Sequence, residues 1–345
     1  MKKKVVLISF SVLIVIAIIS ALVWFFAFRG DKGETINKVT NYQPPIGTNS
    51  GVVNMSSTTG LPFEGEYKPV MCVIENSPQA RPQTGLQTAD VVYEFPVEGG
   101  INRFVTVFSD KVPEGVMPVR SGRAPFLYVQ AEWDALFMHF GGSGAGGSNA
   151  PEYTFYGNSL HSNIKIDLDG LVGSKNGIFK RVNTAPAPHN VMGNLALAQK
   201  EYNYSPAPLK WKFDTTVYYP GDSVNAIELP FTTNTKNFVS YVYDFDKGVY
   251  LRSMSGVPFM AAETKKQLQV KNVIVQYSTY TTQANIYKDW KMVGEGKADF
   301  YIGGMYVQGS WSKASPTEPT VYLDAEGKPI VLKPGNTWIH IHPNK

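Results

Sequence analysis

The chain has 345 residues, 43% of them hydrophobic and 17% charged, so it can bury a sizeable core, and two domains are expected rather than one. The formal net charge of +4 is small and the basic residues are scattered, which argues against nucleic-acid binding. The single cysteine, Cys72, excludes an intramolecular disulfide framework, and its apolar neighbours predict a buried strand thiol rather than a nucleophile.

The N-terminal segment has the pattern of a membrane anchor. Lysines dominate residues 1–4, and residues 5–28 then carry no charge. As a helix, at about 1.5 Å per residue, this run would be about 36 Å long, enough to cross a hydrocarbon core of about 30 Å. It is longer than the apolar region of a cleaved signal peptide and ends in bulky residues, so we expect an uncleaved transmembrane anchor. The lysines would then keep residues 1–4 in the cytoplasm and place the bulk of the chain outside it.

The next segment, residues 29–60, is polar and rich in Asn, Thr, Ser, Gly and Pro. Such a composition buries too little apolar surface to fold by itself. We therefore expect a flexible linker there, and folded sequence from Leu61 onwards.

The first folded domain, residues 61–208, mixes strand and helix patterns. Short apolar runs bounded by Pro and Gly predict strands over 69–76, 90–97 and 102–110. Helical spacing follows over 124–140, with Pro125 suited to the first turn and a glycine-rich loop behind it. A second helix is expected over 189–204, with Asn190 as its N-cap.

The second domain, residues 209–345, is a succession of short strand-like runs separated by turn residues. This spacing is typical of antiparallel sheet in a sandwich or barrel-like arrangement. The expected fold class is therefore α+β: an N-terminal transmembrane helix, a flexible linker, an α+β first domain and a mostly antiparallel β second domain.

Several ordered motifs resemble one bacterial family. The segments "RPQTGLQTADVVYEFPVEGGINRF", "PVRSGR", "HFGGS" and "RVNTAPAPHN", followed by "GVYLRS" and "NVIVQY", are similar to the YerB-like lipoproteins. The resemblance runs from about Leu61 to the end and implies a cell-surface protein with N- and C-terminal domains of unknown function. Members are commonly lipid-modified on a cysteine, and this chain has no cysteine directly after its apolar segment. Because the family has no settled activity, function must be argued from the residues.

The stretch "PVRSGRAP" is the first candidate binding site. Arg120, Ser121 and Arg123 stand at or just before the predicted start of a helix, where unpaired amides and the helix dipole favour an anion. Two guanidinium groups there are suited to phosphate or carboxylate. Further arginines beside turns or at strand ends extend the predicted site: Arg81, Arg103 and Arg181. The alternative is a purely structural network, in which these arginines pair with Glu75, Glu94 and Glu98.

An enzyme is the second hypothesis. Glu94 or Glu98 would serve with His139 or His189 as acid and base in a hydrolase or transferase acting on the cell wall. A serine mechanism using Ser121 and His189 lacks a strained Gly-x-Ser-x-Gly elbow. His139 is alternatively explained as a residue that binds carbonyls at the end of its helix.

No metal site and no cofactor are expected. Asp167 and Asp169 lack the further ligands of a calcium loop, and the glycine-rich loop lacks the Gly-Lys-Ser/Thr signature of nucleotide binding. His340 and His342 lie two apart without a third ligand nearby, which favours exposed strand histidines over a metal pair. The abundant aromatic residues of the second domain suit strand packing better than sugar binding.

We therefore expect a single-pass membrane protein that binds an anionic cell-wall polymer or glycan through the arginines of its first domain. The alternatives are a wall-acting enzyme and a scaffold for other surface proteins, which requires an exposed apolar patch. The sequence does not specify an oligomeric state.

Overall fold

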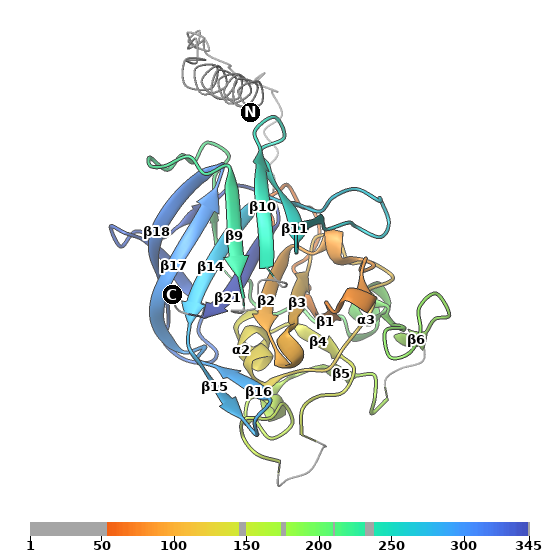
Figure 1. Ribbon diagram of the computed structural model, residues 1–345. Coiled ribbons are helices and arrows are strands. Elements are labelled where there is room, and N and C mark those ends of the chain that lie inside the picture. Colours follow the sequence, from red (N-terminus) through yellow and green to blue (C-terminus); the bar gives the residue numbers. More distant parts are fainter. Residues whose placement is uncertain (1–53, 145–149, 174–176, 210, 232–237, 344–345) are drawn as a thin grey trace, which may run out of the picture. The chain divides into compact units, whose positions relative to one another are not determined.

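The computed structural model describes residues 54–144, 150–173, 177–209, 211–231 and 238–343. Its main feature is a ten-stranded sheet with the strand order β19-β18-β17-β14-β21-β2-β3-β1-β4-β5 (Figure 1). A second, five-stranded sheet has the path β12-β11-β10-β9, with β13 paired to β11. The α+β class is confirmed, and strands greatly outnumber helices within the described ranges.

The first half of the folded chain supplies two α-helices and seven strands. Their bounds are β1 Val70–Glu75, β2 Val91–Pro96, β3 Asn102–Phe108, α2 Ala124–Trp133, β4 Leu136–His139, β5 Asp167–Asp169, β6 Phe179–Arg181, β7 Val191–Gly193 and α3 Leu195–Tyr202.

The second half supplies only strands among its described residues. They are β8 Lys212–Phe213, β9 Ala226–Pro230, β10 Phe238–Asp244, β11 Val249–Met254, β12 Val257–Pro258, β13 Gln269–Val270, β14 Asn272–Ser278, β15 Tyr280–Gln283, β16 Tyr287–Trp290, β17 Gly294–Ile302, β18 Met305–Lys313, β19 Val321–Asp324, β20 Val331–Leu332 and β21 Thr337–Pro343.

One strand joins the two halves into a single sheet. β21 pairs in parallel with β14 on one side and with β2 on the other, so that Glu94 of β2 lies opposite His340. Most other pairings of the second half are antiparallel, as expected. The two halves therefore share a continuous hydrogen-bonded sheet instead of forming two separate β-structures.

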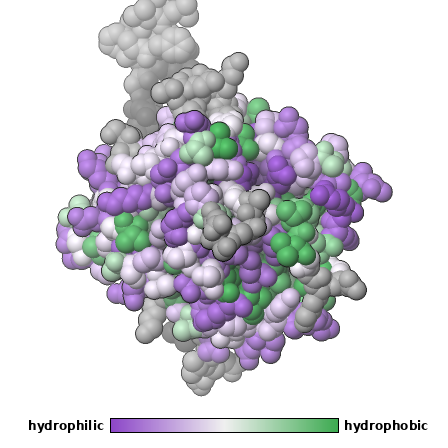
Figure 2. Space-filling model, turned by 90° about the horizontal axis from the view of Figure 1, so that it is seen from below, coloured by the Kyte–Doolittle hydropathy of each residue, from purple (hydrophilic) through white to green (hydrophobic). Residues whose placement is uncertain are grey.

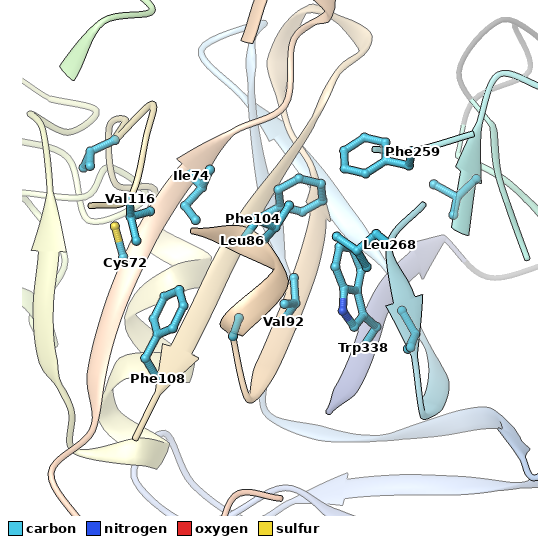
Figure 3. Close-up of a cluster of buried hydrophobic side chains, with 14 of the residues drawn as sticks. Cys72, Ile74, Leu86, Val92, Phe104, Phe108, Val116, Phe259, Leu268 and Trp338 are labelled. Carbon is cyan, nitrogen blue, oxygen red and sulfur yellow. The ribbon is translucent and has the colours of Figure 1, made fainter. Parts of the chain in front are cut away.

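Side chains fill both faces of the central strands. Along β1 all six residues are buried, because Cys72 and Ile74 point into one hydrophobic cluster while Met71 and Val73 point into another. The first cluster includes residues of the five-stranded sheet, and Figure 3 shows part of it around Phe104, Phe259 and Trp338. The second cluster includes α2. Cys72 is fully buried as predicted, and burial raises the pKa of its thiol.

The three predicted strands of the first half are confirmed, but both helices are shorter than expected. α2 ends at Trp133, where Asp134 adopts a left-handed conformation (φ 45°), and the chain then turns extended as β4 to pair with β1. The second helix begins at Leu195, and its N-cap is Asn194, whose side chain accepts a hydrogen bond from Leu197 N. Residues 189–194 were wrongly assigned to this helix, because β7 is formed there instead.

The packed region starts before Leu61. Thr58 Oγ1 donates to Asp90 Oδ2 at 2.9 Å, and Thr59 Oγ1 donates to Asp110 Oδ2 at 2.5 Å. These bonds fix residues predicted as linker, because small hydroxyl side chains can satisfy the carboxylates of the buried Asp90 and the partly buried Asp110. The predicted anchor, residues 5–28, lies outside the described residues. Across the described ranges, no helix is long and apolar enough to cross a membrane.

Candidate ligand-binding site

The candidate site is built around Glu75, the last residue of β1. Its side chain is buried although its backbone lies at the strand end, since the extended segment around Val119 runs beside β1 and Glu75 N donates to Pro118 O. Arg103 of β3 stands directly opposite Glu75 in the antiparallel ladder. The strand register thus places a carboxylate and a guanidinium group at the same edge of the sheet.

Arg120 and His189 converge on the Glu75 carboxylate. Glu75 Oε2 lies 3.2 Å from Arg120 Nε and 2.9 Å from His189 Nδ1, while Ser77 Oγ donates to Oε1 at 2.9 Å. We call Glu75, Arg103, Arg120 and His189 the Glu75 cluster. The Arg120 side chain is 29% exposed, and within the described part of the chain its two terminal nitrogens have no partner. Arg120 therefore retains donors that face an accessible surface.

Arg123 is satisfied by the protein itself. It bonds both carboxylate oxygens of Glu98, and its Nη1 donates to Gly122 O at 2.7 Å. Burial raises the pKa of Glu98, but the hydrogen bonds and charge of Arg123 outweigh burial and lower it. Although α2 begins directly after Arg123 as predicted, Ala124 and Phe126 of its first turn are buried. The helix amides are therefore not presented to solvent.

Arg103 is buried next to two other arginines. Its Nη1 donates to Ser121 O at 2.9 Å, and its Nε has no hydrogen-bond partner among the described residues. Burial, together with the charges of Arg123 and Arg120, lowers the pKa of Arg103 to about 9, against the opposing effect of Glu98. Burial and two neighbouring guanidinium groups therefore both disfavour the charged form of Arg103.

The remaining predicted arginines border the Glu75 cluster without entering it. Arg81 donates to Asn76 Oδ1 at 2.9 Å and to Asn76 O at 2.7 Å, and so holds the residue next to Glu75. Arg181 is exposed and donates to the side chain of Asn190, the residue next to His189. Ser121 Oγ donates to a backbone carbonyl, that of Phe140.

Glu94 belongs to a different, enclosed group. Its carboxylate lies 3.0 Å from Arg252 Nη2 and 3.2 Å from His340 Nδ1, and Tyr241 bonds both Arg252 and His340. All four side chains are fully buried, and Arg252 also lies over the ring of Trp338. Burial raises the pKa of Glu94, but Arg252 and His340 lower it to about 2. We call Glu94, Tyr241, Arg252 and His340 the Glu94 network.

His139 is also enclosed. It lies in β4, not at a helix end, and its ring nitrogens face Gly141 O at 2.9 Å and Asp167 Oδ1 at 2.7 Å. His161 contacts the other oxygen of Asp167 at 3.2 Å. Burial raises the pKa of Asp167, but its bonds to the two histidines lower it to about 2. With no exposed surface, His139 is not placed to exchange protons with a bound substrate.

The histidines of β21 differ from the expectation of exposed side chains. His340 is fully buried and His342 is 6% exposed, because β21 is an internal strand with both faces covered. Among the residues that the structure describes, no three His, Cys, Asp or Glu side chains are grouped so as to hold a metal ion.

Two residues with ionic contacts, Arg252 and His161, were not identified from the sequence. Arg252 alternates with Tyr250 and Met254 on the inward face of β11, so strand periodicity could have revealed a buried charge. His161 lies in a short 3-10 turn, where no periodic signal exists.

Fold and site together define a class of protein: a mixed α+β body in which two sequence halves share one sheet, with an ionic cluster at the end of a strand. The chain belongs to the YerB family. Residues 58–206 match the model described as "Protein of unknown function (DUF3048) N-terminal domain", and residues 227–339 match the corresponding C-terminal domain.

Two comparisons with individual proteins agree. The chain is 32% identical over 296 residues to "Putative lipoprotein YerB" of Bacillus subtilis (strain 168), covering 83% of this chain and 85% of that protein. It is also similar to the crystal structure of the YerB protein from Bacillus subtilis, with a TM-score of 0.72 at 29% identity, covering 84% of this chain and 97% of the other. The resemblance stated from the motifs is therefore confirmed.

Proposed function

We propose that the chain is a membrane-anchored extracytoplasmic protein whose Glu75 cluster binds an anionic group of a cell-envelope polymer. The proposal rests on Arg120. Its Nε pairs with Glu75 at 3.2 Å, and its two terminal nitrogens have no partner among the described residues, so they are available to a ligand. Among the residues that the structure describes, three guanidinium groups, those of Arg103, Arg120 and Arg123, meet only two carboxylates there, those of Glu75 and Glu98. A phosphate or carboxylate would balance the third positive charge, and the planar guanidinium group of Arg120 could bind it with two donors.

The anchoring part of the proposal rests on residues 5–28, which carry no charge and follow three lysines. The Bacillus subtilis relative is described as a lipoprotein, which is a different means of attachment to a membrane. A protease-accessibility experiment on intact cells distinguishes the proposed topology. A tag after Lys345 should be cleaved from outside, and a tag before Met1 should be protected.

Binding is tested with the full chain in detergent and purified, phosphate-containing wall polymer. Arg120→Gln should weaken binding about tenfold, equivalent to about 1.4 kcal/mol, because a planar charged contact is lost. The matched control is Lys328→Gln, which removes a positive charge from an exposed turn far along the sequence. Equal affinity of Arg120→Gln and wild type, with both proteins folded, would refute the binding proposal.

An enzyme is the second candidate, and one observation favours it. Glu75 holds His189 through Nδ1 at 2.9 Å, an arrangement that orients an imidazole and leaves Nε2 for proton transfer beside Arg120. Glu94 and His139, which are enclosed, are not part of this candidate, and Glu98 is held by Arg123.

The enzyme candidate predicts products when the full chain is incubated with wall fragments and the mixture is analysed by mass spectrometry. His189→Gln should abolish them while the affinity for polymer stays within about twofold, since an amide preserves a hydrogen bond to Glu75 but cannot cycle a proton. If a broad panel of wall fragments is returned intact by the wild type, the protein is a binder and not an enzyme.

A scaffold is not proposed. Figure 2 shows that, on one face, hydrophobic residues occur in separate groups between hydrophilic ones. That face offers no single apolar surface of the kind a permanent partner would cover.

A further inference from the structure

A cavity lies in the second half of the chain, where β14 and β17 separate. The two strands pair from Asn272↔Ile302 to Gln276↔Ala298. Beyond that point β14 continues alongside β21 to Ser278, whereas the first residues of β17, from Gly294, pair only with β18. The strands, labelled in Figure 1, thus form a fork, and a cavity of about 420 Å³ occupies it.

The floor of the fork is fixed by Trp311. Its Nε1 donates to Tyr277 O at 2.7 Å. This bond occupies a carbonyl of β14 just beyond the last residue that pairs with β17. Gly296 permits this crossing, because a Cβ there would lie 2.6 Å from Trp311 Nε1 and 2.8 Å from Tyr277 O. The opening is therefore specified by a particular glycine and tryptophan pair.

A carboxylate with spare acceptor capacity lies in the cavity wall. Asp299 is 6% exposed, and it accepts one hydrogen bond from Tyr277 at 2.7 Å and one from Tyr306 at 3.0 Å. Burial and the bond to Asp299 raise the pKa of both phenols, which keeps them as neutral donors. A carboxylate accepts about four hydrogen bonds, so about two positions remain for a ligand.

The rim is polar and electrically balanced. Lys291 and Lys297 offset Glu295 and Asp299, and none of these four has an ion-pair partner among the described residues. Gln308 adds both a donor and an acceptor at the rim. A cavity with no net charge, an aromatic floor and both kinds of hydrogen-bonding group suits a ligand whose own groups donate and accept.

We propose that this fork binds a neutral saccharide unit. Sugar hydroxyls both donate and accept, and a ring offers an apolar face to tyrosine and tryptophan. The cavity volume falls within the range of about 300–1,000 Å³ that is usual for small-ligand sites. The site does not depend on the Glu75 cluster, and it adds a glycan contact in the second half of the chain.

The test uses the full chain in a detergent without a sugar headgroup. Saturation-transfer NMR and calorimetry are run with N-acetylglucosamine, its β-1,4 dimer, glucose and maltose, and with galacturonic acid as a charged comparison. At least one neutral probe should bind. Thr279→Trp, which places a ring at the exposed rim, should weaken that binding at least tenfold, and so should Gln308→Ala.

Thr282→Trp is the matched control, because it makes the same change at another exposed threonine outside the fork and should bind like wild type. Arg120→Gln should also bind the neutral probe normally, which separates this site from the Glu75 cluster. Thermal unfolding verifies that each variant is folded. If Thr279→Trp does not fold, Gln308→Ala, at an exposed residue, still tests the site. The proposal is overturned if no neutral probe binds, if only galacturonic acid binds, or if folded fork variants bind as tightly as wild type.

Discussion

The Glu94 network and the Glu75 cluster contain the same kinds of residue in opposite environments. Each has a glutamate from the first half, an arginine and a histidine within hydrogen-bonding distance. In the Glu94 network every one of these side chains is fully buried, whereas Arg120 of the Glu75 cluster is 29% exposed. Access, and not residue type, therefore separates a structural ion pair from a candidate binding site.

The position of each glutamate in its strand explains the difference. Glu94 lies within β2, which has β21 on one side and β3 on the other, and Arg252 reaches it from β11 of the second sheet. Glu75 is the last residue of β1, where the ladder stops and loops supply the neighbours. Ends of strands are common places for ligand groups for this reason.

The largest effect is expected from Arg252→Met. It leaves the Glu94 carboxylate buried without its guanidinium partner, and this should lower the free energy of unfolding by about 3–5 kcal/mol. Urea denaturation of the full chain measures the change. The double variant Glu94→Gln/Arg252→Met should recover part of the loss because both charges are gone. A single-variant loss below about 1 kcal/mol would mean that the network is not closed as described.

An intermediate effect is expected from acid. The pKa of Glu94 falls from 4.5 to about 2 on folding, so its contribution to stability is present above about pH 4.5 and is lost as the pH falls towards about 2. The full contribution is on the order of 3 kcal/mol. Unfolding free energies measured across this range should decline more steeply for wild type than for Glu94→Gln. Parallel profiles would contradict the lowered pKa.

The smallest effect is expected from Arg120→Met. A partly exposed ion pair contributes about 1 kcal/mol or less, so the free energy of unfolding should change by no more than that. The change should shrink in 1 M salt, which screens exposed charges. Arg181→Met, at an exposed residue, serves as the reference for replacing an arginine without loss of a carboxylate partner. A decrease of about 3 kcal/mol in the free energy of unfolding would mean that the Glu75 cluster, like the Glu94 network, is a structural ion pair.

Local elements were predictable where the pattern was strong. β1, β2 and β3 are apolar runs bounded by Pro and Gly, and Pro125 marked the start of α2. The end of α2 was not predictable, because Leu136–His139 continues the apolar pattern and is made extended by its parallel pairing with β1 and β5. The joining of the halves by β21 is a long-range pairing that no local pattern contains.

The candidate site was predictable only in part. The sequence singled out Arg120, and it named Glu75 among the carboxylates that could pair with the arginines. It did not distinguish Glu75 from Glu94, since both are glutamates in apolar strands and their exposure depends on what covers each strand. The fork that holds the cavity arises because the pairing of β14 with β17 ends at Gln276↔Ala298, a feature of strand pairing and not of composition.

The place of β21 constrains the order in which the molecule can be assembled. Residues 337–343 fill the slot between β14 and β2, so neither half has a complete set of strand neighbours until they have been synthesised. An emerging chain would therefore lack its central strand pairings for most of its translation.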